Sequence, residues 1–154
     1  MKKHSIRPAL PADAEMVGQL VGALFNELRG LPDTAASELD TRLVRKLLGM
    51  EDQVFGFLLQ EDDEVVGIIM LGERNALYAG GTYGVITELY VHPNKRSHGL
   101  AQLLMTKAEE FARNRGWTML EVGAPSVPKW QRSVSFYTSV GFHEVGPRLR
   151  KRLE

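Results

Sequence analysis

The sequence contains no cysteine among its 154 residues. This absence excludes a disulfide framework, a thiolate metal site and a cysteine nucleophile, and it fits a reducing compartment. The basic residues 1–8 are not followed by the apolar segment of a signal peptide, and no apolar run is long enough to span a bilayer. We therefore expect a cytoplasmic protein with no membrane partner.

The sequence also lacks an excess of charge of either sign. Lys plus Arg and Asp plus Glu both number 19, so the formal net charge is zero. A dedicated nucleic-acid binder needs a basic surface to neutralise phosphates, so no nucleic-acid partner is expected. The four histidines stand apart, without the His/Glu spacing of a zinc helix, and no metal is predicted. The phosphate-binding motif Gly-x-x-x-x-Gly-Lys-Ser/Thr and the esterase motif Gly-x-Ser-x-Gly do not occur.

Length and patterning predict one globular domain covering residues 1–154. With 44% hydrophobic and 25% charged residues, the composition suits a single buried core. The turn at residues 60–63 is an acidic cluster that we interpret as solvated, and residues 73–84 read as a flexible connection. The hydrophobic spacing predicts strands at 4–10, 54–59, 64–71, 85–91, 117–122 and 142–149, and helices at 16–28, 37–48, 100–115 and 133–140. This order favours an α+β (mixed α/β) fold with helices on both faces of a sheet.

The segment 85–115 predicts a strand, a basic loop and a helix. Pro93 ends the strand because it has no N–H to donate. In the loop, Gly99 lets the backbone come close to a ligand, and the small Ala101 avoids crowding it. Helix-start N–H groups beside basic side chains form a site for phosphate or pyrophosphate. An ordinary surface turn is the alternative.

The motif Arg96-x-x-Gly99-x-Ala101 resembles the Arg/Gln-x-x-Gly-x-Gly/Ala motif with which GCN5-related N-acetyltransferases bind acetyl-coenzyme A. A second stretch, residues 133–137 followed by Gly141 and Phe142, is similar to that family's Phe-Tyr-x-x-x-Gly-Phe helix and turn. The resemblance covers about residues 85–145. It implies a central, mostly antiparallel twisted sheet of six to seven strands with about four helices, and acetyl-CoA as the co-substrate.

The resemblance also implies which residues bind the cofactor. Backbone groups of Leu89 and Val91 would pair with the pantetheine arm and the acetyl carbonyl, as an added strand does. Lys95, Arg96 and Lys129 would screen the phosphates. The residues expected to bind the cofactor are Leu89, Tyr90, Val91, Lys95, Arg96, Ser97, His98, Gly99, Leu100, Ala101 and Phe136.

Glu88 is the candidate general base, acting directly or through a water, because a protonated amine cannot attack a thioester. Val91 lies three positions after Glu88, so a regular strand places their side chains on opposite faces. A bulge there, as the family resemblance suggests, would bring both into one cleft. The alternative is a solvated or salt-bridged glutamate.

Tyr137 is the candidate general acid. Its phenol has a reference pKa of about 10, so it is protonated at neutral pH and can donate to a departing thiolate. The alternative is a tyrosine of the core, since Val134, Phe136 and Val140 lie on the same helix.

Two positions depart from the family pattern. Ser97 stands where the family often has glycine, and Trp130 stands where it often has asparagine. These departures bear on the tightness of the loop and on one pantetheine contact. Trp130 could instead pack on the cofactor or on the partner subunit of a homodimer.

The sequence favours an acetyl-CoA-dependent N-acetyltransferase that acts on a primary amine. By family analogy, residues 25–40 and 73–83 would line the acceptor site. Two alternatives stay open. A non-catalytic acyl-CoA sensor would need Arg96, Gly99 and Ala101 but not the two catalytic candidates, and a protein-modifying acetyltransferase would differ in its acceptor cleft.

Overall fold

The computed structural model describes residues 2–32, 39–123 and 131–153. The chain divides into two compact units, Met1–Leu120 and Glu121–Glu154, each with its own internal contacts. The single domain expected from the sequence stays a prediction. Within the described residues, no helix combines the length and apolar character needed to cross a bilayer.

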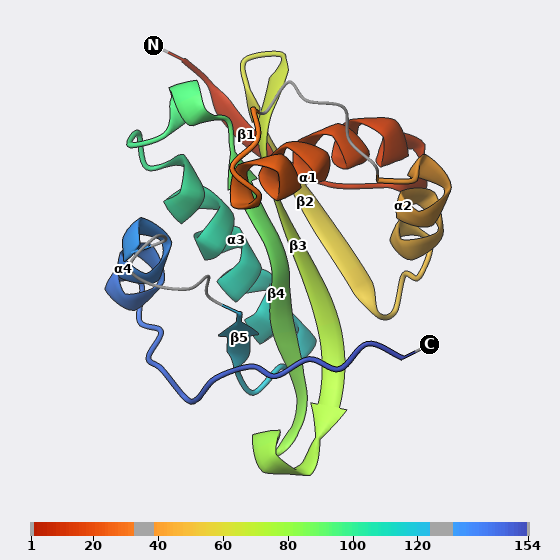
Figure 1. Cartoon of the computed structure of the whole chain (residues 1–154), viewed down its shortest axis with the longest axis vertical. Helices are drawn as coiled ribbons and strands as arrows, with labels where there is room; N and C mark the ends of the chain where they lie inside the picture. Colours follow the sequence, from red (N-terminus) through yellow and green to blue (C-terminus); the bar gives the residue numbers. More distant parts are fainter. Residues whose placement is uncertain (1, 33–38, 124–130, 154) are drawn as a thin grey trace. The chain divides into compact units, whose positions relative to one another are not determined.

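The described strands form one sheet in the order β1-β2-β3-β4-β5, with antiparallel pairing from β1 to β4 (Figure 1). Thr118 N donates to Thr82 O and Gly84 N to Met119 O, so the segment entering β5 runs parallel to β4. The strands are β1 (His4–Pro8), β2 (Val54–Glu61), β3 (Glu64–Ala76), β4 (Gly81–Val91) and β5 (Leu120–Val122). The mostly antiparallel α+β class is confirmed, with five strands in the described residues in place of six to seven.

Two predicted segments differ from the structure. Residues 73–84 are no flexible connection, because β3 and β4 continue as a hairpin from the Glu73–Gly84 pair to the Ala76–Gly81 pair. Gly80, at φ +75°, supplies the left-handed turn, so the glycine that suggested flexibility in fact closes the hairpin. The predicted closing strand at 142–149 is not formed. Gly146 has φ +131° there, and Pro147 lacks an N–H.

Helices cover both faces of the sheet in the first unit (Figure 1). The helices α1 (Ala14–Leu28) and α2 (Thr41–Leu48) lie on one face. Their buried residues Val17, Leu20, Val21, Val44 and Leu48 pack with Leu58, Ile68, Met70 and Tyr90 of the sheet. The helix α3 (Leu100–Arg115) lies on the opposite face, where the ring of Phe111 is 4.7 Å from that of Phe55 and 5.2 Å from that of Phe57. At the end of α3, Gly116 with φ +78° takes the left-handed position.

The second unit contains α4 (Gln131–Ser139), close to the predicted helix at 133–140. The chain then turns at Gly141, which has φ +102°, and Phe142 N donates to Tyr137 O at 3.0 Å. The Tyr137 ring lies 5.5 Å from the ring of Phe136 and 5.6 Å from that of Phe142. These rings form a local apolar cluster at the end of α4.

Candidate functional site

The loop from β4 to α3 presents backbone amides at a helix start. After the turn Pro93–Lys95, the chain reaches Gly99, which precedes α3 with φ +76° and carries no side-chain cap. The first N–H groups of a helix have no acceptor within the helix, and the helix dipole makes that end positive. A Cβ at Gly99 would meet no atom within 4 Å, so the space there is open. This geometry fits an anion such as a phosphate.

Ser97 explains a departure from the family pattern. Its φ is +67°, a left-handed conformation that few non-glycine residues adopt. Glycine at this position would adopt it without strain. The loop therefore keeps, with serine, the backbone shape for which glycine is suited.

The two basic residues of the loop are held by carboxylates of the protein. Lys95 Nζ lies 2.7 Å from Glu61 Oε1. The Arg96 guanidinium donates to both carboxylate oxygens of Glu27, with Nη2 3.0 Å from Oε2, and its Nε donates to Val91 O at 2.9 Å. The predicted contacts of these side chains with phosphates stay predictions, and Lys129 lies outside the described residues.

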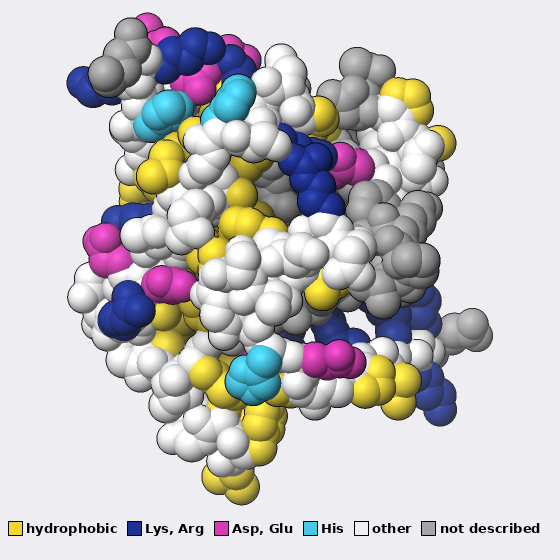
Figure 2. Space-filling view, turned by 90° about the vertical axis from the view of Figure 1, so that its left-hand side faces the viewer, with side chains coloured by type: hydrophobic (Ala, Val, Ile, Leu, Met, Phe, Trp, Pro, Cys, Tyr) yellow, Lys and Arg dark blue, Asp and Glu magenta, His cyan; other side chains and the backbone are white. Residues whose placement is uncertain are grey.

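The acidic turn between β2 and β3 is not solvated throughout. Glu61 is only 7% exposed and accepts hydrogen bonds from Lys95, from His4 at 3.0 Å and from Lys2 at 3.1 Å. These partners, Lys95 first and His4 next, lower the pKa of Glu61 from 4.5 to about 2. Figure 2 shows basic and acidic side chains gathered together at its upper end. The solvated-turn interpretation was wrong for Glu61 because it overlooked cations from distant segments.

A β-bulge lies immediately before Glu88. Ile86 pairs with Leu71 and Glu88 with Met70, so Thr87 is the extra residue on β4. The bulge turns Glu88 onto the sheet face of Met70 and Tyr90, which α1 and α2 cover. From Glu88 to Val91 the pairing is regular, so the side chains of these two residues lie on opposite faces. The bulge expected to bring them into one cleft lies on the other side of Glu88.

Burial raises the pKa of Glu88 above its ordinary 4.5. The Thr87 hydroxyl donates to Glu88 Oε1 at 2.6 Å, and this hydrogen bond opposes the rise. A half-buried carboxylate with a raised pKa is a stronger proton acceptor than an ordinary glutamate.

Tyr137 is half-buried on α4, and this burial raises the pKa of its phenol to about 12. The phenol therefore keeps its proton throughout the neutral range. This protonation state is the one that a general acid needs.

Several predicted cofactor-binding residues are buried in the first unit. Tyr90, Val91 and Leu100 have buried side chains, so only their backbone groups can face a ligand. Leu89 and Ala101 are half-buried, and Ser97 and His98 are exposed on the loop. Phe136 is half-buried in the second unit.

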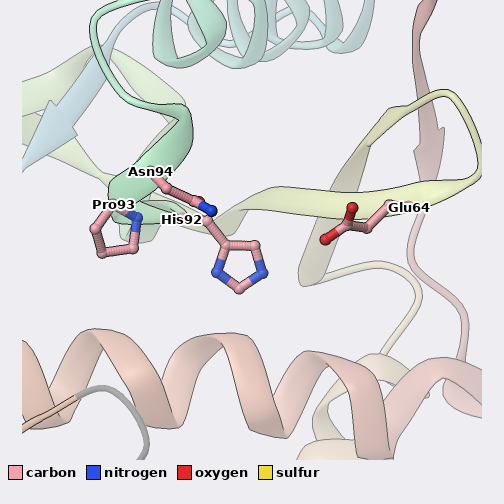
Figure 3. Close-up of a pocket in the computed structure, with 4 residues that line it drawn as sticks. All are labelled: Glu64, His92, Pro93 and Asn94. Carbon is pink, nitrogen blue, oxygen red and sulfur yellow. The ribbon is translucent and has the colours of Figure 1, made fainter.

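An open hollow of about 370 Å³ adjoins the start of this loop. Figure 3 shows Glu64, at the start of β3, and His92 and Asn94, after β4, pointing into one space with α1 on the far side. Among the described residues, no three His, Cys, Asp or Glu side chains gather as metal ligands would.

Sequence reasoning missed Glu27 and Thr87, although each left a signal. Glu27 stands in the last turn of α1, where the helix dipole disfavours a carboxylate unless a cation pairs with it. Thr87 and Glu88 are adjacent polar residues that interrupt the apolar run from Val85 to Val91. This break in the strand pattern is typical of a bulge.

A match to a family model shows to which family the chain belongs. The model of the Acetyltransferase (GNAT) family matches residues 20–142, which include β4, the loop, α3 and α4. The chain belongs to the GNAT acetyltransferase family. The protein is thus an acetyltransferase, and the resemblance carried by the two sequence motifs is confirmed. A comparison with curated protein sequences finds no match.

Solved structures of GNAT proteins have the same fold. An aminoglycoside acetyltransferase from an uncultured soil metagenomic sample is 20% identical, with 99% of each chain covered and a TM-score of 0.81. The ribosomal-protein-alanine N-acetyltransferase of Brucella melitensis biovar Abortus 2308 is 20% identical over 98% of this chain and 100% of its own, at 0.75. An aminoglycoside N-acetyltransferase in complex with CoA is 19% identical over 99% and 96%, also at 0.75. At these identities the likeness shows the fold.

Proposed function

We propose that this GNAT protein transfers an acetyl group from acetyl-CoA to a primary amine by direct attack in a ternary complex. The backbone at Gly99 is the observation that carries the proposal. Its left-handed conformation, the open space beside it and the uncapped start of α3 suit a pyrophosphate. A structural neighbour in complex with CoA adds support.

The proposed chemistry assigns one proton transfer to each catalytic candidate. Acetyl-CoA supplies the thioester, and the amine nitrogen forms a bond to its carbonyl carbon as the carbon–sulfur bond breaks. Glu88 takes the amine proton, directly or through a water, since its pKa is raised by burial. Tyr137 gives its proton to the sulfur and recovers one from solvent, and Glu88 releases the amine proton to solvent. The products are the acetylated amine and free CoA.

The acceptor class is a small-molecule amine or the amino group of a protein. Neighbours with this fold include acetyltransferases named for aminoglycosides and one named for ribosomal-protein alanine. We place an aminoglycoside-like amine first, because such enzymes appear repeatedly among the neighbours. A cytoplasmic location and a homodimer also stay predictions.

The first experiment is calorimetry with CoA on the wild type and on Gly99→Val. A side chain at Gly99 would enter the open space beside the α3 amides, so we expect binding to be lost or greatly weakened. Gly80→Val is the matched control, because Gly80 has φ +75° and open space around it but lies at the β3–β4 turn. Equal loss in both variants, or unchanged affinity in a folded Gly99→Val, contradicts the placement.

Release of thiol in a panel of aminoglycosides, simple amines and peptide N-termini tests the activity. Turnover with any amine supports the enzyme, and the best acceptor defines its class. CoA binding without thiol release for every amine and peptide would favour the sensor alternative. Mass spectrometry of acetylated partners separates a protein acceptor from a small one.

A further inference from the structure

The guanidinium of Arg96 makes contacts on several sides within the first unit. It is 5.4 Å from the centre of the Tyr90 ring, pairs with both carboxylate oxygens of Glu27, and donates from Nε to Val91 O. A guanidinium has five N–H groups in a rigid fork, and three of them are used in these contacts. The side chain of Arg96 therefore links other parts of the protein to one another.

The contacts of Arg96 join segments that are far apart in the sequence. The bond from Arg96 to Val91 O closes the turn between β4 and the loop, and the pair with Glu27 ties this turn to α1, 69 residues away. The side chains of Arg96 and Glu27 are 29% and 30% exposed, so the pair is partly shielded from water. Glu27 also lies at the negative end of α1, where an unpaired carboxylate is disfavoured.

We propose that Glu27 is a positioning residue for cofactor binding, which orders the β4–α3 loop through Arg96 before acetyl-CoA arrives. This inference rests on the proposed function. A loop already held in its bound shape loses less entropy on binding, so affinity rises without a direct contact. The phosphates then meet the amides at the start of α3, while Arg96 keeps its bonds to Glu27.

The test measures CoA affinity by calorimetry, and KM and kcat for acetyl-CoA, in Glu27→Gln. We expect Kd and KM to rise roughly three- to fivefold, the scale of losing a partly exposed charge pair, with kcat within about twofold. In Arg96→Gln and in the double variant Glu27→Gln/Arg96→Gln, the affinities should agree, because Glu27 acts through Arg96.

Glu73→Gln is the matched control. Glu73 pairs with Arg115 through both oxygens, at 2.7 and 3.3 Å, and Arg115 lies 4.5 Å from the centre of the Phe55 ring. This ion pair resembles that of Arg96 and Glu27, but it lies at the end of α3. Glu73→Gln should lower the melting temperature while leaving the Kd for CoA within about twofold.

Whether Glu27→Gln lowers or raises the affinity for CoA distinguishes the possible outcomes. If Arg96 served the phosphates directly, Glu27→Gln would release it and CoA would bind more tightly. Tighter or unchanged binding in Glu27→Gln overturns the positioning role, as does an equal loss of affinity in Glu73→Gln. A wild type that does not bind CoA overturns the proposed function instead.

Discussion

Glu61 is buried and Glu88 is half-buried, and their carboxylates are held in opposite ways. Glu61 accepts hydrogen bonds from Lys95, His4 and Lys2, which lower its pKa to about 2. In the described part of the chain, the hydrogen bond that bears on the pKa of Glu88 comes from a neutral hydroxyl, and burial raises that pKa. A carboxylate among cations stays ionised and stabilises the fold, whereas one buried without a cation can exchange a proton.

Replacing the proton-accepting carboxylate should have the largest effect. Glu88→Gln removes the base but keeps the side chain's shape, so turnover should fall by about 10²- to 10⁴-fold with CoA affinity nearly unchanged. Steady-state kinetics with the best acceptor measures the fall. Glu15→Gln, a change of an exposed glutamate in the first turn of α1, is the control. Turnover of Glu88→Gln within about twofold of the wild type would return Glu88 to a structural role.

Removing the hydroxyl of Tyr137 should have the second largest effect, because this half-buried phenol must keep its proton to act as an acid. Burial raises the pKa of Tyr137 to about 12, so this phenol should produce no alkaline limb between pH 7 and 10. Tyr137→Phe keeps the ring and its packing, and turnover should fall by about 10²-fold, the lower part of the range for acid assistance, since a thiolate leaves readily. The melting temperature should barely move.

Ser139→Ala is the control for Tyr137→Phe, because it removes the hydroxyl of an exposed serine on the same helix. The measurement is turnover with the chemical step shown to be rate-limiting. A rate for Tyr137→Phe that matches the control would place Tyr137 among structural residues.

Removing the Thr87 hydroxyl at the bulge should have a smaller effect. Thr87→Val removes the hydrogen bond that lowers the pKa of Glu88, so this pKa should rise further. A general base works when deprotonated, so the acid limb of the rate profile should move to higher pH. Turnover above that limb should change about twofold or less. An acid limb that stays in place, or moves to lower pH, would show that Thr87 does not tune the base.

Glu61→Gln should affect stability and its dependence on pH. The folded-state pKa of about 2 is below the ordinary 4.5, so ionised Glu61 stabilises the fold above pH 4.5, and this stabilisation is lost as pH falls toward 2. The variant should melt a few degrees below the wild type at pH 7, with the difference shrinking below pH 4.5. Thermal scans from pH 7 to 2.5 measure this. A difference that does not depend on pH would mean that the charge of Glu61 is not what stabilises the fold.

Local sequence patterns predicted much of the fold, but they could not predict contacts between segments that are far apart in the sequence. Helical spacing and Gly116 located α3 at its observed bounds, and Pro93 marked the end of β4. The partners of Lys95 and Arg96 come from segments 34 and 69 residues away, which periodicity cannot identify. The bulge at Thr87 depends on pairing between β3 and β4, so its position relative to Glu88 could not be fixed from one strand.

The pH dependence of kcat/KM, measured for the wild type and Glu88→Gln with the same acceptor, is the direct test of Glu88 as the general base. We expect an acid limb in the wild type at a pH above the ordinary 4.5 of a glutamate, because burial raises the pKa of Glu88. In Glu88→Gln this limb should disappear and leave a low, flat rate. A wild-type limb that persists unchanged in Glu88→Gln would contradict the assignment of Glu88 as the base.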